Sequence, residues 1–243
     1  MYTFKTKVRY SEISSSRLVK PESIVNYLQD CVMFQTNAVG GGVDYYKSEC
    51  KVWVLNSWQI EIKRQLTEDE EITVCTWPYD FAGAYGHRNF VIKDQAGEDV
   101  ILANTLWVFT DITTGRPIKL TEEVRNMYQI ENKLDMEYMD RKVKIADGVT
   151  GEEQLPVPVL KGFIDTNGHV NNGKYIGCAS EYIPDGYKVE RIRAEYKRAA
   201  VYGDTFYPVV YRQDVSEDKA HIWIALNNED GNVYATVQFD IYK

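Results

Sequence analysis

The feature that most constrains the fold of this 243-residue chain is an internal repeat. The pattern of the first half recurs in the second half at a constant offset of 134 positions, without a gap over much of its length. One repeat of this length indicates a duplicated domain rather than a solenoid. The matched positions are Lys63 with Lys197, Arg64 with Arg198, His87 with His221, Phe90 with Ile224, Ile92 with Leu226 and Gly97 with Gly231.

Each copy is predicted to be a helix followed by antiparallel strands, which makes an α+β unit. Residues 2–10 alternate apolar and charged side chains, as a strand does. Pro21 then opens a helix with apolar residues at helical spacing, and the glycines at 40–42 end it. The remaining predicted elements are strands at 52–64, 71–79, 86–94 and 100–111, a second sheet beginning near Leu155, and a second helix from Asn172 to about Ile183.

These patterns divide the chain into a first copy at 1–130, a charged connecting arm at 131–154 and a second copy at 155–243. No apolar run approaches the length of a membrane span, and the first residues lack a signal-peptide pattern. The net charge of −8 argues against a general nucleic-acid binder. Four scattered cysteines without metal-ligand spacing indicate reduced thiols in a cytoplasmic protein. We expect neither a metal nor another cofactor.

Polar groups suited to acid–base chemistry gather just before the second predicted helix. Asp165, Asn167 and His169 alternate along the chain, which has only three histidines. An imidazole can move a proton near neutral pH, and an acid or a carboxamide beside it can orient it. The N-terminus of the helix that follows would supply backbone N–H groups to a developing oxyanion. The plain alternative is a polar turn in which Asn171 or Asn172 caps the helix.

Two other interpretations of this segment fail on spacing. A calcium-binding loop that begins at Asp165 would need its glycine at position 170 and an acid at position 176, where the chain has Val170 and Ile176. A nucleophilic cysteine is not supported either, because Cys178 lies inside the helical pattern and is expected to be a small buried side chain. No G-x-S-x-G nucleophile elbow occurs in the chain.

The segment from Asp165 to Ile176 resembles the D-x-N-x-H-V-N-N-x-x-Y-I signature of the plant and bacterial acyl-ACP thioesterase family, and it matches every fixed position. The resemblance runs through nearly the whole chain. It implies a tandem hotdog fold, in which each copy is a long helix wrapped by a curved antiparallel sheet. It also implies hydrolysis of fatty acyl thioesters on acyl carrier protein, with Asp165, Asn167 and His169 as catalytic residues and Asn171, Asn172 and Gly173 as substrate-binding residues.

The partner that this resemblance implies is an acyl carrier protein whose acyl chain is linked through phosphopantetheine. Basic residues of the second copy, among them Arg193 and Lys197, are expected to meet the acidic carrier or the phosphate of its pantetheine arm. For any single one of them, a solvated strand face remains the plainer interpretation. Both a monomer and a homodimer are compatible with the sequence, because two fused copies already supply a pair.

The chain departs from the family after the motif, where Ala199 replaces an acid and Ala200 replaces the neighbouring cysteine. In the plant enzymes the strand after the motif reads E-Y-R-R-E-C, and the resemblance assigns its second glutamate a catalytic part. Here the same stretch, taken as a strand, runs from Glu195 to Ala200 and has Ala199 in place of that acid. Asp165 is then the only carboxylate within the motif. The alternatives to an acyl-ACP hydrolase are therefore an acyl-CoA thioesterase and a non-catalytic acyl-binding hotdog protein.

Overall fold

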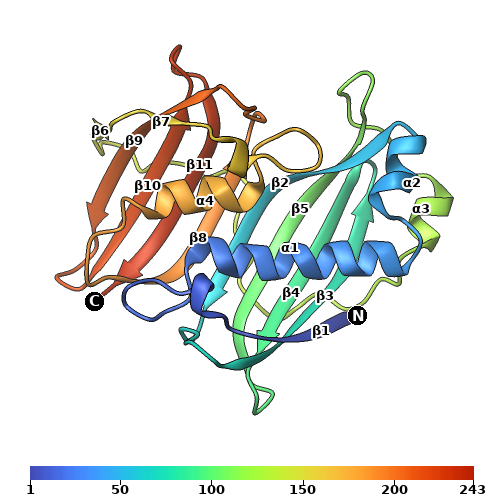
Figure 1. The fold of residues 1–243 in the computed structure, drawn as a ribbon, viewed down its shortest axis with the longest axis horizontal. Helices are drawn as coiled ribbons and strands as arrows, with labels where there is room; N and C mark the ends of the chain where they lie inside the picture. Colours follow the sequence, from blue (N-terminus) through green and yellow to red (C-terminus); the bar gives the residue numbers. More distant parts are fainter. The chain divides into compact units, whose positions relative to one another are not determined.

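The structure is a computed structural model that describes all 243 residues. It comprises two compact units (Figure 1). The first contains residues 1–19, 23–56 and 63–139, and the second contains residues 20–22, 57–62 and 140–243. The predicted connecting arm at 131–154 is therefore divided between the two units, since residues up to Met139 belong to the first. None of the helices is long and apolar enough to cross a membrane.

In the first unit a long helix, α1, lies across an antiparallel sheet with the strand order β1-β3-β4-β5-β2 (Figure 1). Cys31 and Leu28 of α1 are fully buried, and the Cys31 Sγ lies 3.5 Å from the carbonyl oxygen of Val74 in β3. The predicted helix and its buried face are confirmed. The elements are β1 (Tyr2–Lys7), a 3-10 turn (Tyr10–Glu12), α1 (Pro21–Ala38), α2 (Val43–Ser48), β2 (Lys51–Ile62), β3 (Glu71–Ala82), β4 (Tyr85–Lys93), β5 (Asp99–Asp111) and α3 (Glu122–Asn126).

The second unit repeats this plan with a shorter helix. Its strands follow the order β2-β8-β11-β10-β9-β6, and β2 enters it through residues Ser57–Ile62. Helix α4 ends at Ser180 rather than near Ile183, because the N–H groups of Tyr182 and Ile183 donate three residues back, to Ala179 O and Ser180 O, in a tighter 3-10-type turn. The elements are β6 (Gly151–Glu153), β7 (Val157–Pro158), a 3-10 turn (Lys161–Phe163), α4 (Asn172–Ser180), β8 (Lys188–Tyr196), β9 (Thr205–Asp214), β10 (Lys219–Asn227) and β11 (Val233–Tyr242).

The offset of 134 positions holds for the strands down to their irregularities. Strand β4 spans 85–93 and β10 spans 219–227, while β5 and β11 begin at 99 and 233. The register of β4 against β5 shifts between Ile92 and Lys93, and the register of β10 against β11 shifts between Leu226 and Asn227. Because a bulge is a position-specific feature of a sheet, its recurrence at the same offset confirms the duplication.

The segment before each helix is also duplicated, at a different offset. Residues 10–19, the first loop, and residues 161–170, the motif loop, both contain a 3-10 turn followed by a tight turn. Ile13 bridges Val19 in the first loop, and Ile164 bridges Val170 in the motif loop. The N–H of Val19 donates to Leu66 O at 3.0 Å, and the N–H of Val170 donates to Ala200 O at 2.8 Å. Both loops therefore have the same backbone hydrogen bonds.

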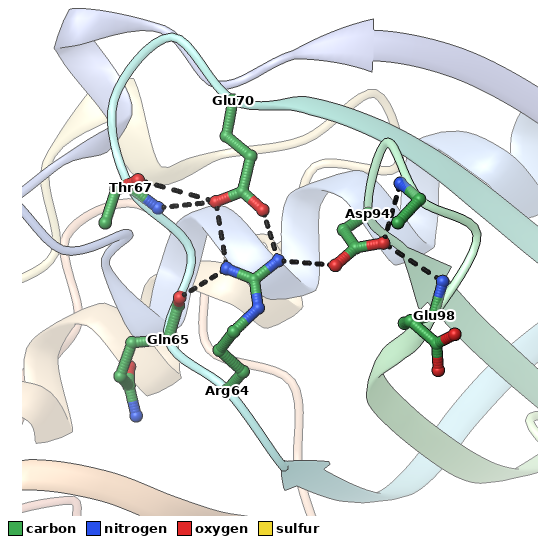
Figure 2. Close-up of polar contacts among 7 residues, drawn as sticks. Arg64, Gln65, Thr67, Glu70, Asp94 and Glu98 are labelled. Atoms are coloured by element: carbon green, nitrogen blue, oxygen red, sulfur yellow. Dashed lines mark hydrogen bonds and ion pairs between the residues drawn. The ribbon is translucent and has the colours of Figure 1, made fainter.

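A charged cluster holds the turn after β2 in the first unit (Figure 2). The Arg64 guanidinium donates to both carboxylate oxygens of Glu70 and, at 3.1 Å, to Asp94 Oδ2. Glu70 Oε2 also accepts the N–H of Thr67 at 3.1 Å. Burial alone would raise the pKa of Glu70, but the hydrogen bonds from Arg64 and Thr67 outweigh it and lower that pKa. We call this cluster the Arg64 clamp.

Candidate functional site

The motif loop is closed by the carboxylate of Asp165. Its Oδ1 accepts the backbone N–H of Asn167 at 2.8 Å and that of His169 at 3.3 Å. The N–H of Asp165 in turn donates to the His169 carbonyl oxygen at 2.7 Å. Gly168 has a φ of 80°, a left-handed conformation that favours glycine. Asp165 therefore fixes the backbone of the loop, whereas the sequence suggested that it would hold a polar side chain.

The side chains of Asn167 and His169 are exposed to solvent. Both residues are exposed, and neither side chain makes a hydrogen bond within the protein. The imidazole and the carboxamide are two positions apart on a backbone that Asp165 holds in one conformation. An unbonded carboxamide can donate to a carbonyl oxygen, and an unbonded imidazole can accept a proton from water. This pair is what remains available for chemistry in the loop.

The start of α4 is used differently from our prediction. Asn171 is the N-cap, and its Oδ1 accepts the N–H of Gly173 at 2.9 Å. The N–H of Lys174 donates to the carbonyl oxygen of Asn171 at 2.9 Å. The N–H of Gly173 is therefore bonded within the cap, as the plain alternative with Asn171 as N-cap predicts, and is not among the free N–H groups expected at this helix N-terminus. Asn172, expected to bind substrate, uses its carbonyl oxygen to accept the Tyr196 hydroxyl at 2.9 Å.

Two tyrosines that sequence reasoning left without a role position the neighbouring chain. The hydroxyl of Tyr175 accepts the N–H of Ala200 at 2.8 Å, and its ring meets that of Tyr196 edge to face at 5.5 Å. Burial raises the pKa of Tyr175 to about 12, so its hydroxyl keeps its proton near neutral pH. Tyr175 stands at the fixed tyrosine of the family signature, which was the one signal that could have singled it out.

These contacts bring position 199 to the motif. Because Val170 donates to Ala200 and Ala200 donates to Tyr175, the chain at 199–200 lies directly against the motif loop. Ala199 is exposed there. The prediction that this stretch continues as a strand is wrong, since β8 ends at Tyr196. The N–H groups of residues 197 and 198 both donate to Tyr234 O, which bends the chain out of the ladder.

Glu195 does not supply the carboxylate that Ala199 lacks. It is 8% exposed, and its Oε2 accepts the N–H of Val143 at 3.2 Å. Its neighbour Arg193, expected to meet the carrier, is equally buried. The Arg193 guanidinium donates to Gln238 Oε1 at 3.0 Å and to the carbonyl oxygen of Lys142 at 2.9 Å. Arg193 therefore holds the arm and is not a surface charge, which corrects its predicted role.

Lys197 does lie at the surface. Its side chain is 43% exposed, and its Nζ is 3.8 Å from Glu195 Oε2.

His221, the counterpart of His87 in the repeat, contacts Asp240 Oδ1 through Nδ1 at 2.7 Å. No group of three or more His, Cys, Asp or Glu side chains is arranged to hold a metal ion.

The family models cover almost all of the chain. The acyl-ACP thioesterase N-terminal domain matches residues 1–128, and the acyl-ACP thioesterase C-terminal domain matches residues 146–243. The chain belongs to the acyl-ACP thioesterase family. The motif loop lies in the part that matches the C-terminal domain of that family.

Curated relatives in the acyl-ACP thioesterase family are similar over most of this chain. The chain is 28% identical over 194 residues to a chloroplastic palmitoyl-acyl carrier protein thioesterase of Cuphea hookeriana, which covers 73% of this chain and 45% of the relative. It is 26% identical over 242 residues to a chloroplastic oleoyl-acyl carrier protein thioesterase of Coriandrum sativum, which covers 90% of this chain and 64% of the relative. The chain thus spans about half to two thirds of the length of these relatives.

Solved structures show the same fold. An acyl-ACP thioesterase from Bacteroides thetaiotaomicron superposes with a TM-score of 0.85 at 19% identity, covering 98% of this chain and 96% of that one. The 12:0-ACP thioesterase from Umbellularia californica superposes with a TM-score of 0.80 at 18% identity, with the same coverage. At such identities the likeness is one of fold, and it confirms the predicted α+β tandem hotdog.

Proposed function

We propose that the protein hydrolyses fatty acyl thioesters carried on acyl carrier protein and releases free fatty acid in fatty acid biosynthesis. The observation that carries the proposal is the exposed, unbonded pair Asn167 and His169 on a loop that Asp165 fixes. Membership of the acyl-ACP thioesterase family supports the choice of reaction, and the printed names of the relatives support an acyl-ACP substrate.

In the proposed reaction, water adds to the thioester carbonyl carbon while the His169 imidazole accepts a proton from it. The carboxamide of Asn167 donates a hydrogen bond to the carbonyl oxygen as negative charge develops there. The C–S bond then breaks, and the imidazolium returns its proton to the leaving thiolate. The products are a fatty acid and the free thiol of the pantetheine arm. Asp165 keeps both side chains in place through the backbone and touches neither.

The second candidate is a non-catalytic acyl-binding protein, and Ala199 is the observation that favours it. Ala199 is next to Ala200, which hydrogen-bonds the motif loop, and it stands where the family has a carboxylate, so this position supplies no acid to assist the attacking water. We favour hydrolysis because the imidazole and the carboxamide are both present and unobstructed.

The deciding experiment is a thioesterase assay on the purified protein with acyl-carrier and acyl-CoA substrates over a series of chain lengths. We expect release of free thiol and preference for the carrier-linked substrates. If the protein binds acyl-carrier without releasing thiol, and Ala199→Glu switches turnover on, the binding function is the correct one. Preference for acyl-CoA would instead identify an acyl-CoA thioesterase.

A cytoplasmic location is part of the same proposal. Its support is the four cysteines, all of which are free thiols in the structure. Thiols remain reduced in the cytoplasm, whereas secreted proteins form disulfides. The names of the curated relatives describe chloroplastic proteins, so fractionation of the source cells is the appropriate measurement.

A further inference from the structure

The Arg64 clamp has a counterpart in the second unit that lacks its central ion pairs. Arg64 corresponds to Arg198 in the repeat, and each follows the strand that leads into the turn. The backbone is the same in both places, because residues 63 and 64 both donate to Val100 O, and residues 197 and 198 both donate to Tyr234 O. The two arginine side chains therefore extend from equivalent backbone positions.

The partners of the two arginines have diverged. Glu70 corresponds to Asp204, which is one methylene shorter and accepts hydrogen bonds from the N–H of Val201 at 2.9 Å and from the Tyr234 hydroxyl, but none from the arginine. Asp94 corresponds to Asn228, whose Oδ1 still accepts two turn N–H groups, as Asp94 does. The turns are preserved, but neither position pairs with the arginine: Asn228 carries no charge, and the Asp204 carboxylate bonds Val201 and Tyr234 instead. The Arg198 side chain is exposed and makes neither an ion pair nor a hydrogen bond.

Arg198 lies beside the motif loop, since Ala200 accepts the N–H of Val170 two residues further on. The adjoining surface is both basic and apolar. Lys161 Nζ lies 5.3 Å from the centre of the Tyr202 ring, and Lys161 is exposed without a carboxylate partner. The large apolar side chains exposed on the same two segments are Leu160 at 54%, Val201 at 41% and Tyr202 at 58%. Cationic side chains next to exposed apolar groups are typical of a protein-docking surface.

We propose that Arg198, Lys161 and Tyr202 form the surface on which the acyl carrier protein docks, with Arg198 receiving its phosphodiester. The inference rests on the proposed function and adds the place where the partner binds. A thioester must reach His169 while it is still attached to its carrier, so the carrier binds next to the motif loop. A guanidinium pairs well with a phosphate, and Arg198 is left without an ion pair because Asn228 is uncharged and Asp204 bonds other groups.

The test compares Michaelis constants for three thioesters of one acyl chain: acyl-carrier, acyl-CoA and acyl-pantetheine, which has neither protein nor phosphate. We expect Arg198→Glu and Lys161→Glu each to raise KM for acyl-carrier about fivefold or more, with loss of the wild-type salt dependence. For acyl-pantetheine, KM and kcat should stay within twofold of wild type. Lys188→Glu is the matched control, because Lys188 also lies over a tyrosine ring, that of Tyr242, at 6.0 Å.

A second variant is designed to pair the Arg198 guanidinium within the protein while Arg198 itself is kept. The double substitution Asp204→Glu and Asn228→Asp gives the equivalent positions the two acidic side chains of the Arg64 clamp, by lengthening one carboxylate and adding the other. We expect it to raise KM for acyl-carrier as Arg198→Glu does, while the melting temperature stays equal or rises. Together with the charge reversals, this variant distinguishes a captured arginine from a disrupted turn.

The docking surface is overturned if Arg198→Glu and Lys161→Glu leave KM for acyl-carrier unchanged, if they raise KM for acyl-pantetheine equally, or if Lys188→Glu has the same effect. Failure of the proposed function looks different. In that case the wild-type protein hydrolyses none of the three thioesters, and docking is measured instead by direct binding of acyl-carrier to the wild-type and Arg198→Glu proteins.

Discussion

The carboxylate of Asp165 acts on the backbone of the motif, and this has consequences for the residues around it. Because its Oδ1 accepts the N–H groups of Asn167 and His169, the two side chains are held by their own main chain and keep their polar atoms unbonded. The motif thus divides two tasks: Asp165 closes the turn, and the side chains of Asn167 and His169 stay exposed.

Substitution of either exposed side chain should abolish most of the activity while the fold survives. We expect His169→Ala and Asn167→Ala each to lower kcat by about two orders of magnitude or more, the usual loss for an acid–base or oxyanion group. Neither side chain contributes a hydrogen bond to the fold, so the unfolding midpoint should not change. Near-normal turnover by a well-folded variant would remove that residue from the site.

Asp165 offers a sharper test, because two substitutions separate its charge from its hydrogen bonds. Asp165→Asn keeps an oxygen that can accept the same two N–H groups, as Asn228 does in its own turn. We expect this variant to keep a large part of the activity and Asp165→Ala to lose most of it. The measurement is kcat for both variants as a function of pH. Equal, near-complete loss in both would show that the charge itself takes part in the reaction.

Among the helices and strands, the features that depend on local sequence patterns were predicted, whereas the features that depend on contacts between distant segments were not. The spacing of apolar residues gave α1 and its buried face, and Pro184 marked the end of α4 to within a turn. The end of β8 and the contact between Val170 and Ala200 could not be predicted, because they depend on hydrogen bonds between segments about thirty residues apart in sequence. The burial of Arg193 was missed for the same reason: its partners lie on a strand and an arm that are distant along the chain.

The Arg64 clamp gives a pH-dependent prediction. Glu70 has a pKa below its ordinary value of 4.5, so the folded state binds fewer protons than the unfolded state near that pH. The contribution of the Glu70 carboxylate to stability is therefore complete above the unfolded-state pKa, and it is lost as the pH falls through the folded-state pKa. We expect Glu70→Gln to lower the free energy of unfolding by about 1 kcal/mol at pH 7, with the difference from wild type shrinking as the pH falls through the lowered pKa of Glu70.

Denaturant unfolding of both proteins between pH 3 and pH 7 measures this effect. Asp204→Asn is the matched control in the second unit, because Asp204 occupies the position of Glu70 but has no arginine partner. Its stability relative to wild type should vary much less with pH. A constant difference for Glu70→Gln across the whole range would contradict the clamp.

For the whole molecule, the repeat was the most reliable guide to the fold. A constant offset in the sequence predicted the two matching sets of strands. The structure adds that the interruptions of their ladders recur at the same offset. The helices could not be obtained in that way: their offset differs from that of the strands, and α4 is 9 residues long whereas α1 is 18.

Thiol reactivity tests the packing of the whole chain. Cys50 is exposed, Cys31 and Cys75 are buried, and Cys178 is partly buried. Burial raises the pKa of Cys31 to about 12 and that of Cys178 to about 11, which suppresses the reactive thiolate. We expect a thiol reagent at pH 8 to modify one cysteine rapidly in the folded protein and all four after denaturation. Cys50→Ser should remove the rapid phase, and a rapid phase that persists in this variant would contradict the packing.

The two loops that share a backbone provide an internal reference within one molecule. The first loop has Ser14, Ser16 and Leu18 where the motif loop has Asp165, Asn167 and His169, yet the same turn forms in both. The geometry of the turn is therefore inherited independently of the acid, the amide and the imidazole. In a spectroscopic titration, signals that move in both loops report the turn itself, whereas signals that move in the motif loop alone report protonation or ligand.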